Sequence, residues 1–295
     1  MSKKHKAYHE ERDSPFFRLQ SKSKLADLLF IGQQKLKSLA REKELYYKFK
    51  KEKKSGGYRD ISAPRDDLKA VQSRIADLLQ RLAPPDFLFA PVAGRSYVDN
   101  AAMHIGANSV HLLDILDFFP SCSGNKVVWF FRQRMQCSLD VSVVLKNLVT
   151  QNDALPQGSP CSPILAYLCY VDMWEEIEKS VTARNCILSV YADDLTISGD
   201  TVPGELVWQI KKTLRKYGHQ YNNNKESSKH LKPVEITGVI LTPNGLSVPN
   251  RQLKKLHEVK SAISLARAKS EIDSLTLRLR GRESQIRQIT QRNGA

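Results

Sequence analysis

Apolar positions recur along the chain with two different periods, and each period predicts a different kind of element. A spacing of three to four residues is typical of amphipathic helices. Shorter β-branched runs are typical of strands and predict hairpins. We expect helices within residues 23–50, 67–82, 164–181 and 204–217, from Ser123, over 139–150, and over 250–268 and 269–291. We expect strands or strand hairpins in the ranges 50–62, 112–119, 189–198 and 236–248, with a strand over 236–241.

Two adjacent carboxylates, Asp193 and Asp194, occupy the tip of one predicted hairpin. Apolar residues from Ser189 lead up to them, and a second run of the same kind leads away to Ser198. Adjacent aspartates are also common in ordinary tight turns, because their short side chains bond to the local backbone. Here the flanking strands are expected to be largely buried, so two unpaired charges would be costly unless a cation met them. This context favours a metal site.

A third carboxylate, Asp114, lies near the end of another predicted strand. If the two strands are neighbours, Asp114 and Asp193 lie side by side and offer only oxygen ligands. Such ligands suit Mg²⁺, which readily bridges to substrate phosphates. Two Mg²⁺ ions would support nucleotidyl transfer, since one activates an attacking hydroxyl and both stabilise the charge that develops.

A lysine cluster and a Gly-Gly turn stand at the tip of the hairpin predicted over residues 50–62. This segment is either a solvated surface turn or a mobile β-loop that binds phosphate. In the second interpretation Lys53 and Arg59 clamp a triphosphate, because a guanidinium offers a forked donor to phosphate oxygens.

The proline-rich segment around Gln157 and Gly158 precedes a long apolar helix. It is either a plain helix entry or, because the free N–H groups of a helix N-terminus attract anions, part of a ligand pocket. His104, taken alone, is expected to be a hydrogen-bonded structural histidine.

Composition and charge narrow the class of protein. Of the 295 residues, 41% are hydrophobic and 26% are charged, which is typical of a globular protein with a sizeable core. The net charge of +15 favours nucleic acids as partners. We expect no membrane association, because no segment reaches the roughly 18 apolar residues of a membrane span. The polar N-terminus lacks the apolar core of a signal peptide, which predicts a cytoplasmic protein.

The five cysteines show no C-x-x-C spacing, so we expect buried thiols and neither a disulfide framework nor a zinc site. The two C-terminal helices are dominated by cations with few acids to pair them, which favours a nucleic-acid cradle over an ordinary solvated face. Their cations, with one residue just beyond, are Arg251, Lys254, Lys255, Lys260, Arg267, Lys269, Arg278, Arg280, Arg282, Arg287 and Arg292.

The order of these segments resembles that of a reverse transcriptase. Residues 53–59 resemble the fingers, Asp114–Phe119 the first palm motif, and Pro156–Gly158 the second. Tyr191–Asp194 (Y-A-D-D) matches the Y-x-D-D box, and Asn222–Lys225 (N-x-x-K) the next palm motif. A lone Y-x-D-D box is weak support, but five motifs in order are specific.

Two further segments resemble elements of the bacterial retron branch. Asn100–His104 (N-A-A-M-H) is similar to its N-A-x-x-H element, and Ile236–Gly238 (I-T-G) to its V-T-G element. The resemblance implies that these elements help to recognise the cognate RNA, and we expect RNA contacts from them and from the C-terminal helices. The replacement of valine by Ile236 keeps the β-branch. The expected RNA-binding residues are Asn100, His104, Ile236, Thr237, Gly238, Arg251, Lys254, Lys255, Arg278, Arg280 and Arg282.

The resemblance also implies a fold and a set of roles. The fold is α+β, a right-hand polymerase with fingers, an antiparallel-sheet palm and a helical thumb. We expect a basic N-terminal arm over 1–22, loose or ordered only on binding, fingers and palm over 23–231, and a β-hairpin with helical thumb over 232–295.

In this frame Asp114 and Asp193 bind two Mg²⁺ ions, with Asp194 adjacent. Phe119 excludes a ribose 2′-hydroxyl. The remaining nucleotide-binding residues are Lys53 and Arg59 on the phosphates, Gln157 and Gly158 in the pocket, and Lys225 as the proton donor to pyrophosphate.

The resemblance implies an RNA-directed DNA polymerase that copies its own structured non-coding RNA, as template and primer, from deoxynucleoside triphosphates. Its product is a branched RNA–DNA, the multicopy single-stranded DNA, within a phage-defence or toxin–antitoxin system that includes an effector protein encoded nearby. Two alternatives stay open. One is another bacterial reverse transcriptase, of the group II intron or diversity-generating type. The other is a scaffold that binds RNA or RNA–DNA and restrains an effector.

Overall fold

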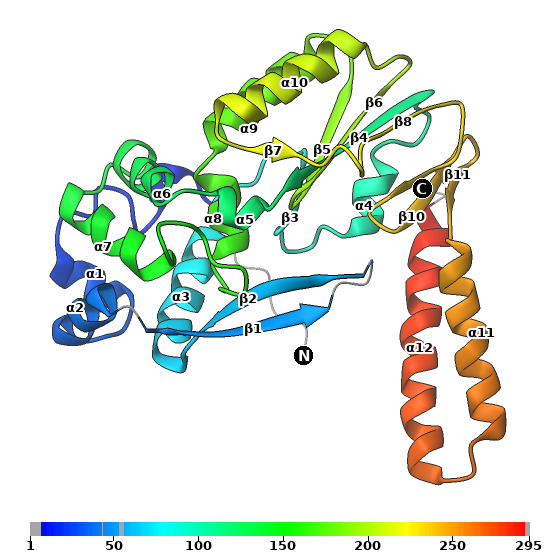
Figure 1. Ribbon diagram of the computed structural model, residues 1–295, viewed down its shortest axis with the longest axis horizontal. Helices are drawn as coiled ribbons and strands as arrows, with labels where there is room; N and C mark the ends of the chain where they lie inside the picture. Colours follow the sequence, from blue (N-terminus) through cyan, green and yellow to red (C-terminus); the bar gives the residue numbers. More distant parts are fainter. Residues whose placement is uncertain (1–6, 43, 53–55, 293–295) are drawn as a thin grey trace.

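The computed structural model describes residues 7–42, 44–52 and 56–292 of the chain. A central sheet of six strands has the order β3-β5-β6-β4-β7, and β8 also pairs with β4 (Figure 1). Neighbouring strands are antiparallel except β3 and β5, which are parallel. The strands are β3 (Leu88–Ala90), β4 (Ser109–Leu116), β5 (Ile187–Tyr191), β6 (Asp194–Gly199), β7 (Gln220–Tyr221) and β8 (Ser227–His230).

Two smaller sheets lie beside this one. The first is an antiparallel hairpin that pairs Glu52 with Tyr58 and extends from the body of the molecule (Figure 1). The second is antiparallel, in the order β11-β10-β9. Their strands are β1 (Tyr46–Glu52), β2 (Tyr58–Pro64), β9 (Val234–Ile236), β10 (Val239–Thr242) and β11 (Gly245–Ser247).

Helices cover the sheet, and two of them protrude from the molecule (Figure 1). Serine side chains begin several helices, because the hydroxyl of Ser123, for example, accepts a hydrogen bond from the free N–H of Lys126. The helices are α1 (Lys22–Leu28), α2 (Gln33–Arg41), α3 (Asp66–Leu79), α4 (Tyr97–Ala102), α5 (Phe118–Ser121), α6 (Gly124–Trp129), α7 (Leu139–Val149), α8 (Ser162–Leu168), α9 (Val171–Thr182), α10 (Gly204–Lys216), α11 (Asn250–Leu265) and α12 (Lys269–Gln291), with a 3-10 turn η1 (Glu11–Asp13) and a π-helical turn η2 (Phe130–Arg134).

The two faces of the central sheet differ, because successive side chains of a strand point to opposite faces. On one face Leu113 of β4, opposite Leu195 of β6, joins the main apolar core together with side chains of α9 and α10. On the other face Asp114 lies directly opposite Asp194, and Leu112 opposite Thr196. The register of β4 against β6 therefore places two carboxylates side by side on the face away from the main core.

A second apolar cluster lies where α4, β4, the β9–β11 sheet and the end of α12 meet. Val98 of α4, Ile236 of β9, Val239 of β10 and Ile289 of α12 are all buried in it. Apart from this contact, α11 and α12 pack mainly on each other and project away from the sheets (Figure 1). Val259 is the buried residue of α11, and Ile289 that of α12.

Several sequence predictions are confirmed at the level of elements: the hairpin at 50–62, the helices at 67–82, 139–150 and 204–217, the Asp193–Asp194 hairpin, and both C-terminal helices. Within the described residues all five cysteines are free and buried, as expected.

Three predictions of secondary structure are wrong in part. Residues 46–50 are not part of the helix expected within 23–50. They belong to β1, where pairing with β2 satisfies their backbone groups. The single helix expected over 164–181 is divided into α8 and α9 at Cys169 and Tyr170. The strand expected over 236–241 is interrupted by a turn at Thr237 and Gly238, both of which have positive φ, 47° and 97°.

The N-terminal arm is not loose from residue 7 onward. Phe16 is fully buried, and its ring lies edge-on against Phe131 with centroids 5.5 Å apart. His9 N donates to Arg81 O over 2.9 Å. Apolar residues in an otherwise charged segment thus anchor it to the main core, while residues 1–6 lie outside the described part.

Candidate active site

Three carboxylates lie together where β4 and β5 end and β6 begins. Asp114 of β4 is 5% exposed and pairs across the ladder with Asp194. Asp193 lies in the turn between β5 and β6, after Ala192 with its positive φ of 59°. The backbone N–H of Ile115 donates to Asp193 O over 2.9 Å, which fixes this turn against the end of β4.

Burial and neighbouring charges favour the protonated forms of Asp193 and Asp194. Burial, together with the charges of Asp193 and Asp114, raises the pKa of Asp194 to about 7. Burial also raises the pKa of Asp193, with the charge of Asp114 adding to it and the charges of Lys225 and Arg59 opposing it. Either a proton or a cation relieves such a cluster.

Lys225 supplies a positive charge at this cluster. Its ammonium lies 2.6 Å from Asp114 Oδ2, and this hydrogen bond raises the pKa of Lys225. The backbone holds the lysine in place, because Asn222 N donates to Asp114 O over 2.8 Å and Lys225 N to Asn222 O over 3.1 Å. The N-x-x-K segment is therefore attached directly to the carboxylate strand.

The donor set suits Mg²⁺, since buried carboxylate oxygens are the ligands that this ion prefers. Among the described residues, no group of three or more His, Cys, Asp or Glu side chains is placed to hold a metal ion by itself. In this structure the carboxylate of Asp114 is paired with Lys225. Mg²⁺ needs no such protein cage, because it is commonly held by one or two carboxylates together with substrate phosphates.

A cleft of about 270 Å³ opens beside the carboxylates, on the face of the sheet away from the main core. Side chains from four separate segments contribute polar groups to it. They include Asp114, Asp194, Thr196, Lys225, Glu235 and Thr237. The cleft thus runs from the carboxylates to the turn between β9 and β10.

The segment with Gln157 and Gly158 touches the β1–β2 hairpin. Ser62 N of β2 donates to Gln157 O over 2.8 Å. Gly158 has φ 132°, and a Cβ there would lie 2.9 Å from Ser62 O, so only glycine fits this close approach. Arg59 is exposed on β2 and lowers the pKa of Asp193, so its charge acts on the carboxylate cluster. Lys53 lies outside the described residues.

Phe119 follows β4 on the single turn α5. It is partly buried and packs beside Phe118, with ring centroids 5.8 Å apart. Asp117, which begins this turn, has φ 45° and ψ 48°, a conformation that turns the chain sharply after the strand. The six residues from Asp114 to Phe119 therefore carry the chain out of the sheet within one turn.

Comparison with known proteins identifies the family to which the chain belongs. Residues 50–241 match the family model described as reverse transcriptase (RNA-dependent DNA polymerase). The chain belongs to the reverse transcriptase family. It is 32% identical over 233 residues to the Retron Ec83 reverse transcriptase of Escherichia coli, across 71% of this chain and 72% of that protein. It is also a member of the bacterial retron branch, and its α+β polymerase fold is as expected.

Two further retron relatives are longer than the part that matches. The Retron Se72 reverse transcriptase of Salmonella heidelberg (strain 579083-10) is 31% identical over 227 residues, 73% of this chain and 60% of that one. The Retron Ec86 reverse transcriptase of Escherichia coli is 36% identical over 145 residues, 49% of this chain and 45% of that one. The chain thus spans less than two thirds of either relative.

Among solved structures, a foamy viral protease-reverse transcriptase in complex with RNA/DNA hybrid is similar at a TM-score of 0.44 and 16% identity, over 78% of this chain and 26% of that one. None of the helices in the described part of the chain combines the length and apolar character needed to cross a bilayer.

The two retron elements meet inside the reverse transcriptase rather than on its surface. Asn100 Nδ2 donates to Thr237 Oγ1 over 3.3 Å, and Thr237 Oγ1 donates to Tyr97 O over 3.2 Å. Asn100 and His104 are both fully buried. Their expected direct contact with RNA is therefore wrong, because neither side chain reaches a surface.

His104 has the structural role that its residue type alone suggested. Its two ring nitrogens lie 2.6 Å from Ser198 Oγ and 2.8 Å from Ser189 Oγ, so it connects β6 to β5 behind the carboxylate turn. Burial lowers the pKa of His104 to about 4, and the ring is neutral at pH 7.

The remaining residues of the I-T-G element also contact other parts of the protein. Ile236 is 1% exposed in the second apolar cluster, which excludes it from direct RNA contact. Gly238 O accepts a hydrogen bond from Gln252 Nε2 over 2.9 Å, so the turn is attached to the start of α11.

The cations of α11 and α12 fall into two groups. Arg251 forms an ion pair with Glu235, which engages its guanidinium within the protein. Within the described residues, the other cations on these helices that we expected to contact RNA are not paired in this way. Lys254, Lys255, Arg278 and Arg280 are exposed, and Arg282 is half-buried.

Sequence reasoning missed several residues of the site. Thr196 lines the cleft, and Ser198 bonds to His104. Alternation along β6 could have found both residues, because it places them on the same face of the sheet as Asp194. Glu235 lines the cleft with no sequence signal of its own.

Proposed function

We propose that the protein is an RNA-directed DNA polymerase of the retron type. The observation that carries the proposal is the buried cluster of Asp114, Asp193 and Asp194, whose raised proton affinity is relieved by a divalent cation. The reaction joins a deoxynucleoside triphosphate to a primer hydroxyl and releases pyrophosphate.

Asp114 and Asp193 would hold two Mg²⁺ ions, with Asp194 adjacent. When bound, the ions activate the attacking hydroxyl and stabilise the charge that develops on the transferred phosphoryl group. Before binding, Lys225 neutralises Asp114 through their 2.6 Å contact. Lys225 is close enough to the site that, once released from Asp114, it would donate a proton to the departing pyrophosphate.

The nucleotide would lie between the carboxylates and the β1–β2 hairpin. Arg59 and Lys53 would bind its phosphates, since a guanidinium offers a forked pair of donors. Gln157 and Gly158 would form the wall of this pocket, and Phe119 would exclude a 2′-hydroxyl by crowding the sugar.

In domain terms, we assign fingers and palm to residues 23–231 and the thumb to 232–295, with 1–22 as an N-terminal arm. The helices α11 and α12 support a thumb that binds nucleic acid, because exposed cations dominate their surface and few of their residues are buried. Lys254, Lys255, Arg278 and Arg280 would contact phosphates directly, while the half-buried Thr237 and Gly238 would shape the turn that supports this surface.

The template and primer would be the cognate structured non-coding RNA, and the product the branched RNA–DNA known as multicopy single-stranded DNA. The protein would act in the cytoplasm with an effector encoded nearby, in phage defence. The names of the relatives support the retron assignment.

The test is DNA synthesis by the protein purified with its RNA. Asp193→Asn keeps the shape of the side chain and removes its charge, so we expect synthesis to fall by about a thousandfold or more. Asp200→Asn is the matched control, because Asp200 lies just beyond the other end of β6, where it bonds to Asn108. Full synthesis by the Asp193 variant would overturn the assignment and favour a scaffold that binds RNA without copying it.

A further inference from the structure

The turn α5, which carries Phe119, rests on a buried group of rings. The Phe118 ring lies edge-on against Trp174, with centroids 6.4 Å apart, and 5.6 Å from His219. His219 in turn lies 4.4 Å from the ring of Tyr170. Trp174, Tyr170 and His219 are each at most 1% exposed. The support under Phe119 thus comes from two distant segments, around 170–174 and at 219.

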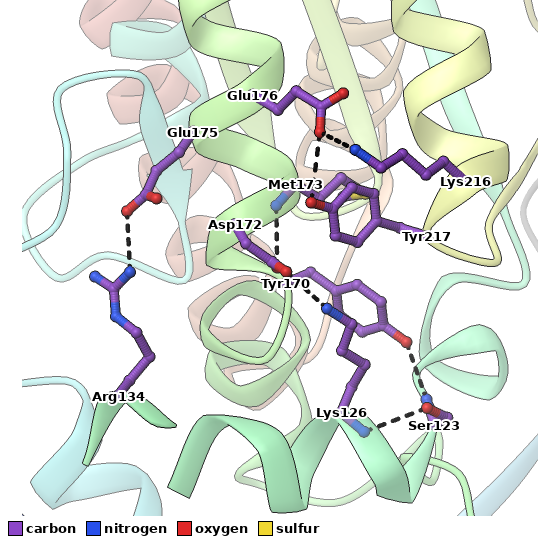
Figure 2. A network of polar contacts seen from close by, with 10 residues as sticks. All are labelled: Ser123, Lys126, Arg134, Tyr170, Asp172, Met173, Glu175, Glu176, Lys216 and Tyr217. Atoms are coloured by element: carbon purple, nitrogen blue, oxygen red, sulfur yellow. Dashed lines mark hydrogen bonds and ion pairs between the residues drawn. The ribbon is translucent and has the colours of Figure 1, made fainter. Parts of the chain in front are cut away.

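Hydrogen bonds attach both of these segments to the last residue of the turn. The Ser121 hydroxyl donates to Phe118 O over 2.8 Å, and its oxygen lies 2.7 Å from His219 Nδ1. Because the Ser121 hydrogen is already used, Nδ1 of His219 is the donor in that contact. The Tyr170 hydroxyl donates to Ser121 O over 3.2 Å. It also accepts from Ser123 N over 3.1 Å, a contact shown in Figure 2.

His219 does not titrate near neutral pH. Burial and the charge of Lys126 together lower its pKa to about 4, so the ring is neutral at pH 7. Lys126 lies over the rings of Tyr170 and Tyr217, at 5.4 and 4.7 Å from their centroids, and forms a 2.8 Å ion pair with Asp172 (Figure 2). These contacts hold Tyr170 against the start of α6.

The same support is connected to the carboxylate strand. Only two residues separate His219 from Asn222, and they form β7, where Tyr221 pairs with Ile115. Asn222 N then donates to Asp114 O over 2.8 Å. One segment therefore fixes the end of β4 at Asp114 and the turn after it at Ser121.

We propose that His219 and Tyr170 are positioning residues for sugar selection: by holding Ser121, they keep Phe119 from moving away from a ribonucleotide. The inference rests on the proposed function, in which Phe119 crowds the 2′-hydroxyl. Steric exclusion works only if the excluding side chain cannot retreat, and a well-packed support resists such a shift. Neither residue touches the nucleotide.

The test compares kcat/KM for a deoxynucleotide and for the matching ribonucleotide at one template position. Tyr170→Phe removes a single oxygen and frees Ser121 O. We expect deoxynucleotide use to stay within about twofold and ribonucleotide use to rise about tenfold, since small changes in fit have effects of this size. Tyr167→Phe is the control, because Tyr167 is also buried but packs edge-on against Phe87.

A second pair of variants separates positioning from stability. His219→Ala removes both the ring and the donor, whereas His219→Asn keeps an amide N–H near the place of Nδ1. We expect selection to be lost in the first variant and largely rescued in the second, although both remove most of a buried ring.

Unchanged selection in both Tyr170→Phe and a folded His219→Ala protein would overturn the inference while leaving the polymerase assignment intact. An equal loss of selection in His219→Ala and His219→Asn would also overturn it. A wild-type protein that incorporates neither nucleotide would overturn both.

Discussion

The β5–β6 hairpin and the α11–α12 hairpin are each two elements joined by a short turn, but they are stabilised in opposite ways. β5 and β6 lie inside the sheet between β3 and β4, and both faces are covered: Leu188 and Ile197 are buried in the main core, and Ser189 and Ser198 are buried on the other side. By contrast, α11 and α12 bury one residue each. Burial on two faces fixes the carboxylates, whereas the helical hairpin offers a surface.

The largest expected difference between the two regions is in stability. Ile197→Ala should lower the free energy of unfolding by about 4 kcal/mol, because it leaves a cavity in a fully packed strand. Leu277→Ala on α12 should change it by less than about 0.5 kcal/mol, since that side chain is 71% exposed. Urea denaturation of both variants measures this, and equal losses would contradict the contrast.

A smaller and local effect is expected where the helical hairpin meets the second apolar cluster. Ile289 is fully buried there, and Arg292 nearby forms an ion pair with Asp99 of α4. Ile289→Ala should cost about 2 kcal/mol and loosen α12 from α4. Amide hydrogen exchange should then speed up in α11 and α12 but not in β5 and β6. Faster exchange in both regions would show that the hairpin is no separate unit.

The carboxylate site should show a dependence on pH that the helical hairpin lacks. The pKa of Asp194 is raised from 3.8 to about 7, so the folded protein keeps a proton that the unfolded chain releases. The stability that this bound proton contributes is therefore lost as pH rises from 3.8 to about 7. Thermal melting without divalent cations should show this decline. Mg²⁺ should stabilise more at pH 8 than at pH 5.5, because protons and metal compete.

Asp194→Asn is the control for this experiment, because it removes the titrating group and keeps the shape. It should weaken both the decline with pH and the pH dependence of the Mg²⁺ effect. If the wild-type and variant curves stay parallel, the carboxylate cluster is not what couples protons to metal.

The smallest expected effect is on the salt dependence of RNA binding. Arg278→Ala and Arg280→Ala should each reduce the slope of log affinity against log salt by about 1, as for a lost phosphate contact. Arg251→Ala should leave the slope unchanged, because Glu235 already pairs with that guanidinium. Filter binding over a series of salt concentrations measures all three, and equal slopes for all variants would exclude α12 as a phosphate-binding surface.

Prediction from the sequence succeeded where a local pattern carries the whole signal. The two apolar runs around Asp193 and Asp194 predicted the hairpin and its tip, because short apolar, β-branched runs favour buried strands. Prediction failed where contacts with distant residues decide the structure. Residues 46–50 lie in a range predicted as helical but pair with β2, and the single helix expected over 164–181 is divided at Tyr170, whose side chain bonds to the distant Ser121.

The retron elements show the same limit at the level of function. Asn100 and Thr237 are 137 residues apart in the chain, and their hydrogen bond is visible only in the fold. A motif shared by a family indicates that its residues matter, but burial decides what they contact. Here they join the carboxylate sheet to the base of the helical hairpin.

The sequence by itself determined which residues could carry the chemistry: acids between apolar strands, and cations on amphipathic helices. Only the tertiary structure decided which of them meet, because strand register and packing set distances between residues far apart in the chain. The pairing of β4 with β6 brings Asp114 to Asp194, and a slip of one residue would turn one of the two carboxylates into the main core.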